Sequence, residues 1–538
     1  MNTLYYGDNL EILRQHVPDE SVDLVYLDPP FNSNATYNVL FKERTGEESP
    51  AQIKAFTDTW EWTRESERTF EQEIIGNPSA SPKVKEMIGA FLSFIGRNAM
   101  MAYLVMMTPR LVELHRVLKP TGSIYLHCDP TASHYLKVVM DTVFGARSFM
   151  NEVVWPRTNA HHDAKRYGRI HDDILYYAKS PRPIWNTLYT AYTDEQIEAH
   201  YATVEESTGR RFRLSDLSAQ KPGGDVEYEW RGVYPPAGRY WAYSKDNMQT
   251  FEKEGRLYYT KNRRPFLKRY LDEMPGNPVQ DIWSDVRFIH GSSAELLGYK
   301  TQKPEALLER IILASSNEGD VVLDPFCGCG TAVAAAQKLN RQWIGIDITH
   351  LAVALMKNRL KTGHGLLPGQ DYEVVGEPVD VGSARALAEQ DRHQFQYWAM
   401  SLVEALPRGD QKKGADRGID GVVHFVEGKR RTMEKAIVQV KSGKVSSPHI
   451  RDLKGTMERE KAALGLFITL EEPTREMERE AVSAGFYHSE LWQRDYPKIQ
   501  IRTAGELLEG NGFEMPNQPS GYKAAPRVGE QAEQGRLN

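Results

Sequence analysis

The sequence predicts an α/β protein built on a doubly wound parallel sheet, followed by a second, smaller α/β domain. Short apolar runs alternate with helical segments through the first 158 residues. Residues 320–347 then run from a strand through a glycine-rich turn and a helix to a second strand that ends in an acid. After a linker at 366–390 that contains Gly and Pro, a further alternation of helices and strands predicts the smaller domain.

The composition limits the class of protein. A chain of 538 residues suggests about three compact units, at roughly 150 residues each. Its net charge of -6 argues against a surface coated with nucleic acid, but it leaves room for a local basic groove. Cys128, Cys327 and Cys329 offer no disulfide framework and fit a reducing, cytoplasmic setting. We expect no membrane segment, because no apolar run reaches about 18 residues.

The first 158 residues predict strands and helices in turn. The expected strands lie at 4–8, 22–27, 123–127 and 151–155, and the expected helices at 9–13, 91–118 and 133–144. The segment Lys119-Pro-Thr-Gly122 is expected to end the long helix. Residues 32–81 are polar, rich in aromatic side chains and weakly periodic, which predicts a long functional loop.

The strand at 22–27 ends in Asp28, Pro29, Pro30 and Phe31. Both prolines lack an N–H group, so nearby carbonyl groups stay free as acceptors, and Phe31 offers a ring for stacking. The exocyclic amine of a nucleobase is a poor nucleophile, because its lone pair is delocalised into the ring. Acceptors at Asp28 and Pro29 would hold the amine hydrogens, relocalise that pair and take up the proton as a methyl group arrives. The competing interpretation is a turn that only ends a strand.

Residues 320–347 predict a nucleotide-binding unit. Gly328 and Gly330 allow the backbone to approach a ligand, and Asp347 at the end of the second strand can hold ribose hydroxyls. Asp324 is placed to meet a charged amino group. Because the glycine pattern is not G-x-G-x-x-G, S-adenosylmethionine is favoured over a dinucleotide, since it brings no pyrophosphate to the helix start.

Between 159 and 279 the pattern changes to tyrosines, tryptophans, prolines and basic residues without a clear period. The segments Tyr228–Arg231, Pro235–Trp241 and Lys261–Arg264 interleave aromatic rings with positive charge. Aromatic rings can stack on bases while Arg and Lys hold phosphates, which predicts a nucleic-acid-reading insertion. An irregular domain with solvated arginines is the alternative.

With these stretches described, residues 1–365 resemble the bacterial DNA amino-methyltransferases of the β class, in which the Asp-Pro-Pro-aromatic motif precedes the cofactor motif. Five segments match in type and order: Gly7–Leu13, Asp28–Ser33, Leu118–Asp129, Lys300–Glu305 and Asp324–Thr331. The resemblance implies a Rossmann-like methyltransferase fold, S-adenosylmethionine as methyl donor and double-stranded DNA as partner, with the target base flipped out. Aspartate at position 28 favours N6 of adenine over N4 of cytosine.

The same resemblance implies roles for single residues. Asp28, Pro29, Pro30 and Phe31 would hold the amine and stack the base. The expected cofactor-binding residues are Asp8, Lys303, Pro304, Asp324, Pro325, Phe326, Gly328, Gly330, Thr331 and Asp347. The expected division is a catalytic half at 1–158, a target-recognition insertion at 159–279 and a cofactor-binding half at 280–365. A homodimer is left open.

The last domain, at 391–510, carries a second candidate site. A helix is expected at 391–406, and Asp420 stands just before a strand at 422–426. Gln439 and Lys441 share one face of the next strand, near Asp420. An acid on one strand, with an acid or amide and a lysine on the next, is typical of a site for Mg²⁺ and a hydrolytic water, with Asp420 and Gln439 as the expected ligands.

This segment resembles the Mrr-type restriction endonuclease-like domain, whose motif is Asp followed by Gln-x-Lys. The resemblance implies Asp420, Gln439 and Lys441 as catalytic residues and Glu404 as an additional acid. Residues 408–461 hold 14 Lys and Arg against 8 Asp and Glu, which suits phosphate contacts. An inactive nuclease fold kept for DNA binding is the alternative, because Gln439 removes one carboxylate. Residues 511–538 are expected to be a disordered tail.

Three functions stay open at this point. The leading hypothesis is a DNA adenine-N6 methyltransferase fused to a nuclease-like domain of a restriction–modification or defence system. The second keeps the methyltransferase but changes its target to N4 of cytosine, to RNA or to a protein side-chain amide. The third is a DNA-binding scaffold with a spent pocket, which would not bind S-adenosylmethionine.

Overall fold

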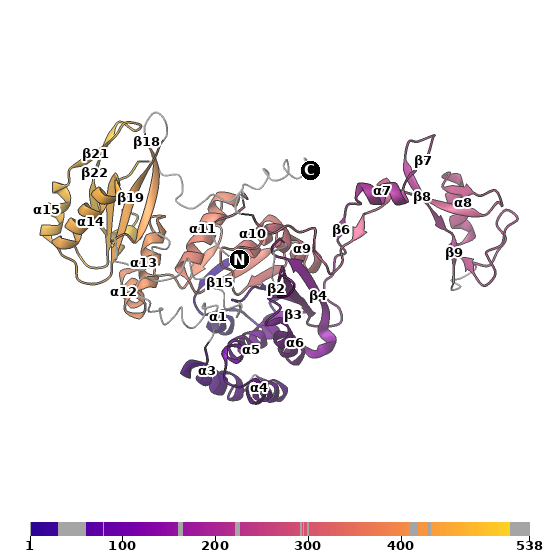
Figure 1. The fold of residues 1–538 in the computed structure, drawn as a ribbon, viewed down its shortest axis with the longest axis horizontal. Helices are drawn as coiled ribbons and strands as arrows, with labels where there is room; N and C mark the ends of the chain where they lie inside the picture. The colour runs from indigo at the N-terminus through magenta and orange to yellow at the C-terminus, as the bar shows by residue number, and fades with distance from the viewer. Residues whose placement is uncertain are drawn as a thin grey trace. The chain divides into compact units, whose positions relative to one another are not determined.

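The computed structural model describes residues 2–30, 61–78, 80–159, 165–220, 226–290, 293, 295–297, 301–407, 418–427 and 432–516. The chain forms two compact units. One comprises Met1–Asn186 and Asp281–Asn538, and the other comprises Thr187–Gln280 (Figure 1).

Eight strands form the main sheet of the larger unit, in the order β16-β1-β15-β14-β2-β3-β5-β4. Their bounds are β1 Thr3–Tyr6, β2 Val22–Leu27, β3 Leu118–Cys128, β4 Phe149–Pro156, β5 His171–Ala178, β14 Val321–Asp324, β15 Gln342–Asp347 and β16 Glu373–Val375. Neighbours pair in parallel from β16 to β3, whereas β5 is antiparallel to β3 and β4. β2 is buried along its whole length, as in parallel strands covered on both faces. The predicted doubly wound sheet is confirmed.

Helices cover both faces of this sheet. In Figure 1, α1, α4, α5 and α6 lie on one side of the strands and α9, α10 and α11 on the other. Their bounds are α1 Asn9–His16, α4 Pro82–Ile95, α5 Ala99–Val117, α6 Ser133–Met140, α9 Glu305–Ser315, α10 Thr331–Lys338 and α11 His350–His364. The largest core cluster lies between the first set of helices and strands β2 and β3.

Three local expectations were wrong in this part of the chain. The helix expected at 91–118 is two helices, because Gly96 adopts φ +71° after α4 and the Asn98 side chain caps α5 by accepting from Met101 N. The strand expected at 123–127 begins earlier, at Leu118, so Lys119–Gly122 lies within β3, although the helix ends at Val117, next to the expected end. Residues 64–75, expected to be loop, form α3 (Arg64–Thr69) and a π-helical turn (Phe70–Ile75), and a capping box at Thr63 starts this helical segment.

The smaller unit begins later than the insertion expected from the sequence, because β5 is a strand of the main sheet. It contains a four-stranded antiparallel sheet in the order β11-β12-β8-β7. The strands are β7 Thr203–Val204, β8 Arg211–Asp216, β11 Leu257–Tyr259 and β12 Pro265–Tyr270, and the helices are α7 Asp194–His200 and α8 Lys245–Lys253. Its core is formed by Leu217, Val226, Trp230, Trp241, Met248, Leu257 and Leu267.

The nuclease-like domain follows a linker that is partly structured, since β16 joins the main sheet and α12 (Val381–Gln390) packs in the next domain. Its sheet has the order β17-β18-β19-β20-β23. The elements are β17 Leu406–Pro407, β18 Gly421–Glu427, β19 Thr432–Lys441, β20 Leu464–Thr469, β23 Ile499–Thr503, α13 Arg392–Ser401, α14 Ser447–Glu460, α15 Arg475–Ser483 and α16 Ala504–Leu508. Separate apolar clusters cover its two faces.

The end of the chain differs in part from the expected tail. Glu514 N donates to the Gln500 side chain, so residues up to 516 pack against the domain. Residues 517–538 lie outside the described chain. Among the described helices, none combines the length and apolar character that crossing a bilayer requires.

Asp23, at the amino end of β2, holds three strands of the main sheet together. Its carboxylate is 4% exposed and accepts from Lys119 Nζ on β3 at 2.7 Å and from Val321 N on β14 at 2.9 Å. We expect Asp23→Ala to lower the free energy of unfolding by about 2 kcal/mol, because a backbone donor and an ammonium lose their acceptor. Urea denaturation measures this change.

Asp19→Ala is the matched control, because the Asp19 carboxylate is 74% exposed in its ion pair with Arg116. Its loss should cost less than about 1 kcal/mol. Equal losses for the two variants would contradict the role given to Asp23.

Candidate active site

Asp28 and Asp324 come from opposite ends of the methyltransferase-like region and meet at one edge of the main sheet. β2 and β14 are hydrogen-bonded neighbours that run parallel, with Leu24 opposite Val322 and Val25 opposite Leu323. Asp324 is the last residue of β14, and Asp28 directly follows β2. The two candidate motifs therefore lie side by side, at the carboxyl edge where ligands bind in open α/β sheets. Pro29 and Pro30 follow there, and Phe31 lies outside the described residues.

Lys303 contacts Asp28 directly. Its Nζ donates to Asp28 Oδ2 at 2.5 Å, and the two side chains are 12% and 16% exposed. Pro304, the next residue, takes the N-cap position of α9, so the start of this helix fixes where Lys303 lies. The sequence placed Lys303 beside the cofactor, whereas the structure places its ammonium on the catalytic candidate.

Asp324 is a buried carboxyl group that accepts from Phe326 N at 3.0 Å. Burial raises the pKa of Asp324 well above its usual value, and the charges of Asp28 and Asp347 raise it further, although Lys303 opposes them. Buried acids gathered at one edge favour a positively charged ligand, because a cation would stabilise their ionised forms. S-adenosylmethionine carries a sulfonium and an ammonium, so this donor set fits it.

Two glycines of the turn after β14 adopt left-handed backbone conformations. Gly328 and Gly330 have φ of +50° and +75°, and a Cβ on Gly330 would lie 2.4 Å from the Met356 side chain. Thr331 begins α10 and accepts from the buried guanidinium of Arg359 at 3.0 Å. The turn is thus packed closely against α11.

Asp347, at the end of β15, ties this turn to the start of α11. It accepts from Gly328 N at 2.9 Å and from the N and Oγ1 of Thr349, both at 2.9 Å. The backbone of Ile348 also hydrogen-bonds to the Asp347 carboxylate, so these contacts use its about four acceptor positions. Burial raises the pKa of Asp347 to about 6, although these hydrogen bonds oppose the shift.

Asp8 lies at the same edge, after β1. Its side chain caps α1 by accepting from Leu10 N at 2.7 Å, and Arg110 donates to both of its carboxylate oxygens at 3.0 and 2.9 Å. A small hollow beside it is lined by Gly7, Asp8, Asn9, Met106, Arg110, Pro325, Phe326 and Ile348. The structure therefore brings Asp8, Pro325 and Phe326 together, as the sequence predicted for the cofactor pocket.

A buried polar line behind Asp28 was missed by the sequence analysis. The Tyr26 hydroxyl lies 3.0 Å from His127 Nδ1, and His127 Nε2 lies 3.1 Å from Asp172 Oδ2. Arg157 donates to the other oxygen of Asp172 at 3.0 Å. Hydrogen bonding to His127 and the nearby positive charges lower the pKa of Asp172 despite its burial. The strand that carries Asp172 lay within the expected insertion, so nothing in the sequence paired it with His127.

In the smaller unit, the aromatic and basic residues noted in the sequence mostly serve the fold. Trp230 and Trp241 are 5% and 1% exposed and belong to the core. Arg231 pairs with Glu252 at 2.7 Å, and Arg264 pairs with Asp216 at 3.1 Å. The composition alone did not distinguish core aromatic side chains from exposed stacking surfaces.

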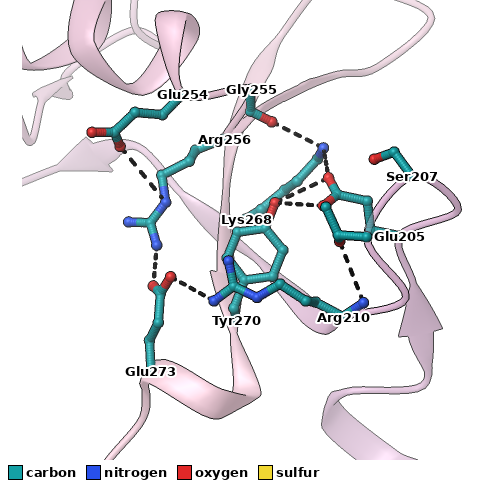
Figure 2. Close-up of a pocket in the computed structure, with 10 residues that line it drawn as sticks. Glu205, Ser207, Arg210, Glu254, Gly255, Arg256, Lys268, Tyr270 and Glu273 are labelled. Atoms are coloured by element: carbon teal, nitrogen blue, oxygen red, sulfur yellow. Dashed lines mark hydrogen bonds and ion pairs between the residues drawn. The ribbon is translucent and has the colours of Figure 1, made fainter.

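The same unit has a polar hollow of about 740 Å³, shown in Figure 2. Its charged lining residues are Glu205, Glu254, Glu273, Arg210, Arg256 and Lys268. Lys268 pairs with Glu205 at 2.6 Å, and Arg210 pairs with Glu273 at 2.7 Å while lying 3.8 Å from the centre of the Tyr270 ring. Because the lining cations and carboxylates are equal in number and paired, this hollow offers no net charge to a ligand.

The second candidate site, in the nuclease-like domain, brings Asp420 and Gln439 together as predicted. Asp420 N donates to Val438 O at 3.0 Å, and Val440 N donates to Asp420 Oδ2 at 2.7 Å, so Asp420 lies opposite Gln439. The Gln439 amide is buried and donates to Gly418 O. A Cβ at Gly418 would lie 2.8 Å from Gln439 Nε2, so the close approach requires glycine.

The expected additional acid is elsewhere. Glu404 pairs with Lys361 on α11 at 2.9 Å. Within the described parts of the chain, no cluster of three or more His, Cys, Asp or Glu side chains could hold a metal ion. Lys441 ends β19 two residues after Gln439, so it shares the strand face of Gln439 as predicted, and Glu404 is the member of the predicted set that lies elsewhere.

Two family models match separate parts of the chain. Residues 22–358 match the model described as DNA methylase, of the N6/N4 type. Residues 393–509 match the model described as NACHT-associated inactive restriction endonuclease 1. The boundary between the matches agrees with the start of the nuclease-like domain at α13.

Curated relatives point in the same direction. The chain is 31% identical over 298 residues to the type II methyltransferase M.EcaI of Enterobacter cloacae, covering 55% of this chain and 65% of that protein. It is 27% identical over 359 residues to the type III restriction-modification enzyme StyLTI Mod subunit of Salmonella typhimurium, covering 63% and 50%. It is 25% identical over 359 residues to the DNA adenine methyltransferase YhdJ of Escherichia coli, covering 66% and 82%.

The chain thus spans less than two thirds of the first two relatives. The DNA methylase match covers more than half of this chain, and it includes both strands that meet at the acidic edge of the main sheet. The chain therefore belongs to the DNA methylase family of the N6/N4 type.

Proposed function

We propose that the chain methylates the exocyclic amine of a base in double-stranded DNA, with S-adenosylmethionine as the methyl donor and N6 of adenine as the target. The observation that carries this proposal is the pairing of β2 with β14, which sets Asp28 beside Asp324. Membership of the N6/N4 DNA methylase family supports the reaction class. Aspartate at position 28 supports adenine over cytosine.

The buried acids at the sheet edge would hold the cofactor. Asp324 would face its positive charge, Asp347 would lie beside the ribose hydroxyls while holding the glycine turn, and Asp8 would line the adjoining hollow. When bound, S-adenosylmethionine supplies an electrophilic methyl group. The close packing of Gly330 against Met356 fixes the turn that this ligand would contact.

Asp28 would act on the amine. Its carboxylate, with the carbonyl group of Pro29, would accept the amine hydrogens, localise the nitrogen lone pair and receive the proton that leaves the nitrogen as the new N–C bond forms. Lys303 donates to Oδ2 of Asp28 and so orients the carboxylate. A carboxylate can accept from this ammonium and from an amine at once.

The role of Asp28 is tested by Asp28→Ala. This change should lower transfer of a labelled methyl group to duplex DNA by at least about 100-fold, since general-base and acceptor contributions are of that size. Calorimetric affinity for S-adenosylmethionine should change less than threefold, because the acid acts on the amine. Retained transfer would show that Asp28 is not the acceptor, and no transfer by the parent chain to any DNA would count against the proposed reaction.

The raised pKa of Asp347 predicts a pH dependence of cofactor binding. Because the pKa of Asp347 is about 6 in the free protein, most of this carboxyl group is ionised above pH 7. The ionised fraction falls as the pH drops below 6. A cation or hydroxyl donor bound there favours the ionised form, so the affinity for S-adenosylmethionine should fall by up to about tenfold per pH unit below that value. Calorimetric titration with S-adenosylmethionine at pH 7.5 and at pH 5 measures this change in affinity.

Asp347→Asn provides the comparison, because the amide does not titrate. We expect weaker binding in this variant, with a smaller change between the two pH values. The same pH dependence in both proteins would assign the titration to another group.

For the last domain we propose DNA binding without cleavage. Gln439 carries no carboxylate and its Nε2 donates to Gly418 O, and Glu404 pairs with Lys361, so the predicted set places no second carboxylate beside Asp420. The description of the matched family as inactive supports this proposal. The excess of Lys and Arg in residues 408–461 supports contact with phosphates.

The test is incubation of the full chain with Mg²⁺ and duplex DNA, methylated and unmethylated, followed by gel analysis. We expect the DNA to stay intact. Lys441→Ala serves as the control for contamination. Cutting that requires Mg²⁺ and disappears in Lys441→Ala would establish an active nuclease and reject the proposal.

A further inference from the structure

The sheet β11-β12-β8-β7 of the smaller unit carries cations on both faces. The two faces differ in whether carboxylates pair with these cations. Residues opposite one another in antiparallel strands point to the same side, and successive residues alternate. On β8 and β12, Tyr270 lies opposite Phe212, and Arg269 lies opposite Arg213. Lys268 and Tyr270 are thus on one face, and Arg213 and Arg269 are on the other.

The first face is the one in Figure 2, and its charges are balanced. Lys268 pairs with Glu205, and Arg256 pairs with Glu273. Hydrogen bonding to Lys268 lowers the pKa of Glu205 to about 2. These cations stabilise the unit by neutralising its own acids.

The second face holds arginines that contact only neutral groups. Arg269 donates to Ser215 Oγ and to the Tyr243 hydroxyl, both at 3.1 Å. Arg213 lies 5.5 Å from the centre of the Tyr201 ring, and Arg211 reaches Tyr201 O at 3.5 Å. No carboxylate of the described residues is within ion-pair distance of these three guanidiniums. We call Arg211, Arg213 and Arg269 the arginine face.

This arrangement costs stability. Like charges directly opposite one another on paired strands repel, and Arg213 and Arg269 are such a pair. Arg211 follows on the same face of β8, and both Arg211 and Arg213 are exposed. Glu205 and Glu273 lie instead beside the paired cations of the other face. An anionic partner would neutralise the arginine face.

We propose that the arginine face binds the phosphate backbone of duplex DNA. Guanidinium groups match phosphate oxygens with two parallel hydrogen bonds, and a row of them follows a chain of phosphates better than a single point charge. Among the basic residues in the segments singled out in the sequence, Arg231 and Arg264 are already held in ion pairs. The proposal rests on duplex DNA being the substrate.

The experiment measures binding of the full chain to a fluorescent 30-base-pair duplex by anisotropy across a series of KCl concentrations. Each lost phosphate contact lowers the slope of log K against log [KCl] by about 1. The double variant Arg211→Gln with Arg213→Gln should therefore lose about 2 from the slope, on duplexes of any sequence. Arg211→Lys with Arg213→Lys keeps the charge and should keep most of the slope.

The matched control is Arg231→Gln with Arg264→Gln, which removes the same charge from ion-paired positions in the same unit. Its slope should change by less than about 0.5. The melting temperature of the Arg211→Gln, Arg213→Gln protein should not fall, because a repulsive pair is relieved.

Four results would overturn the proposal. They are a parental slope in the Arg211→Gln, Arg213→Gln protein, an equal loss in the control, a lowered melting temperature, and loss of the slope in the lysine variant. If the parent chain itself fails to bind duplex DNA, the proposed function falls together with this surface. If the parent chain binds duplex DNA and the variants keep its slope, only the role given to the arginine face is rejected.

Discussion

The structure depends on the parallel pairing of β2 with β14, two strands that stand near opposite ends of the methyltransferase region. Side chains alternate along a strand, so a shift of one residue in this register would turn Asp324 away from Asp28 and toward the other helical layer. Asp23 fixes the register from the amino end, where it accepts from both Lys119 and Val321. The site at the carboxyl end is therefore set by contacts at the other end of the same strands.

Burial of carboxyl groups is the second constraint at this edge. Asp324 and Asp347 are almost fully buried, and removal from water raises the pKa of both. Ionisation of these acids is therefore unfavourable in the free protein, and a cationic ligand would stabilise their ionised forms. Lys303 supplies one positive charge, which contacts Asp28. Behind Asp28, the side chains of Tyr26, His127 and Asp172 form a buried hydrogen-bonded line. The same buried acids thus affect both the stability of the fold and the binding of a cationic ligand.

In the two remaining parts of the chain, ion pairs and hydrogen bonds determine what a charged or polar side chain is free to bind. In the smaller unit, Lys268 and Arg256 are engaged by acids, whereas Arg213 and Arg269 face each other without one among the described residues. In the nuclease-like domain, Gln439 lies opposite Asp420 as in a metal site, yet its amide is held by the backbone of Gly418. Residue type and approximate position agree with a motif in both cases, and the hydrogen bonds decide what the residues can do.

The sequence by itself determined the strands Val22–Leu27 and Gln342–Asp347, because each is an apolar run bounded by charged, proline or glycine residues, and it placed Asp28, Asp324 and the glycine turn at strand ends. It missed the break at Gly96 and the membership of β5 in the main sheet, since both depend on packing with distant segments. Tertiary packing sets the ion pairs: the contact of Lys303 with Asp28, the balanced face of the small sheet, and the arginine face without a carboxylate partner among the described residues. Ion pairs and hydrogen bonds act over a few ångströms between residues far apart in the chain, so the local sequence pattern does not predict them.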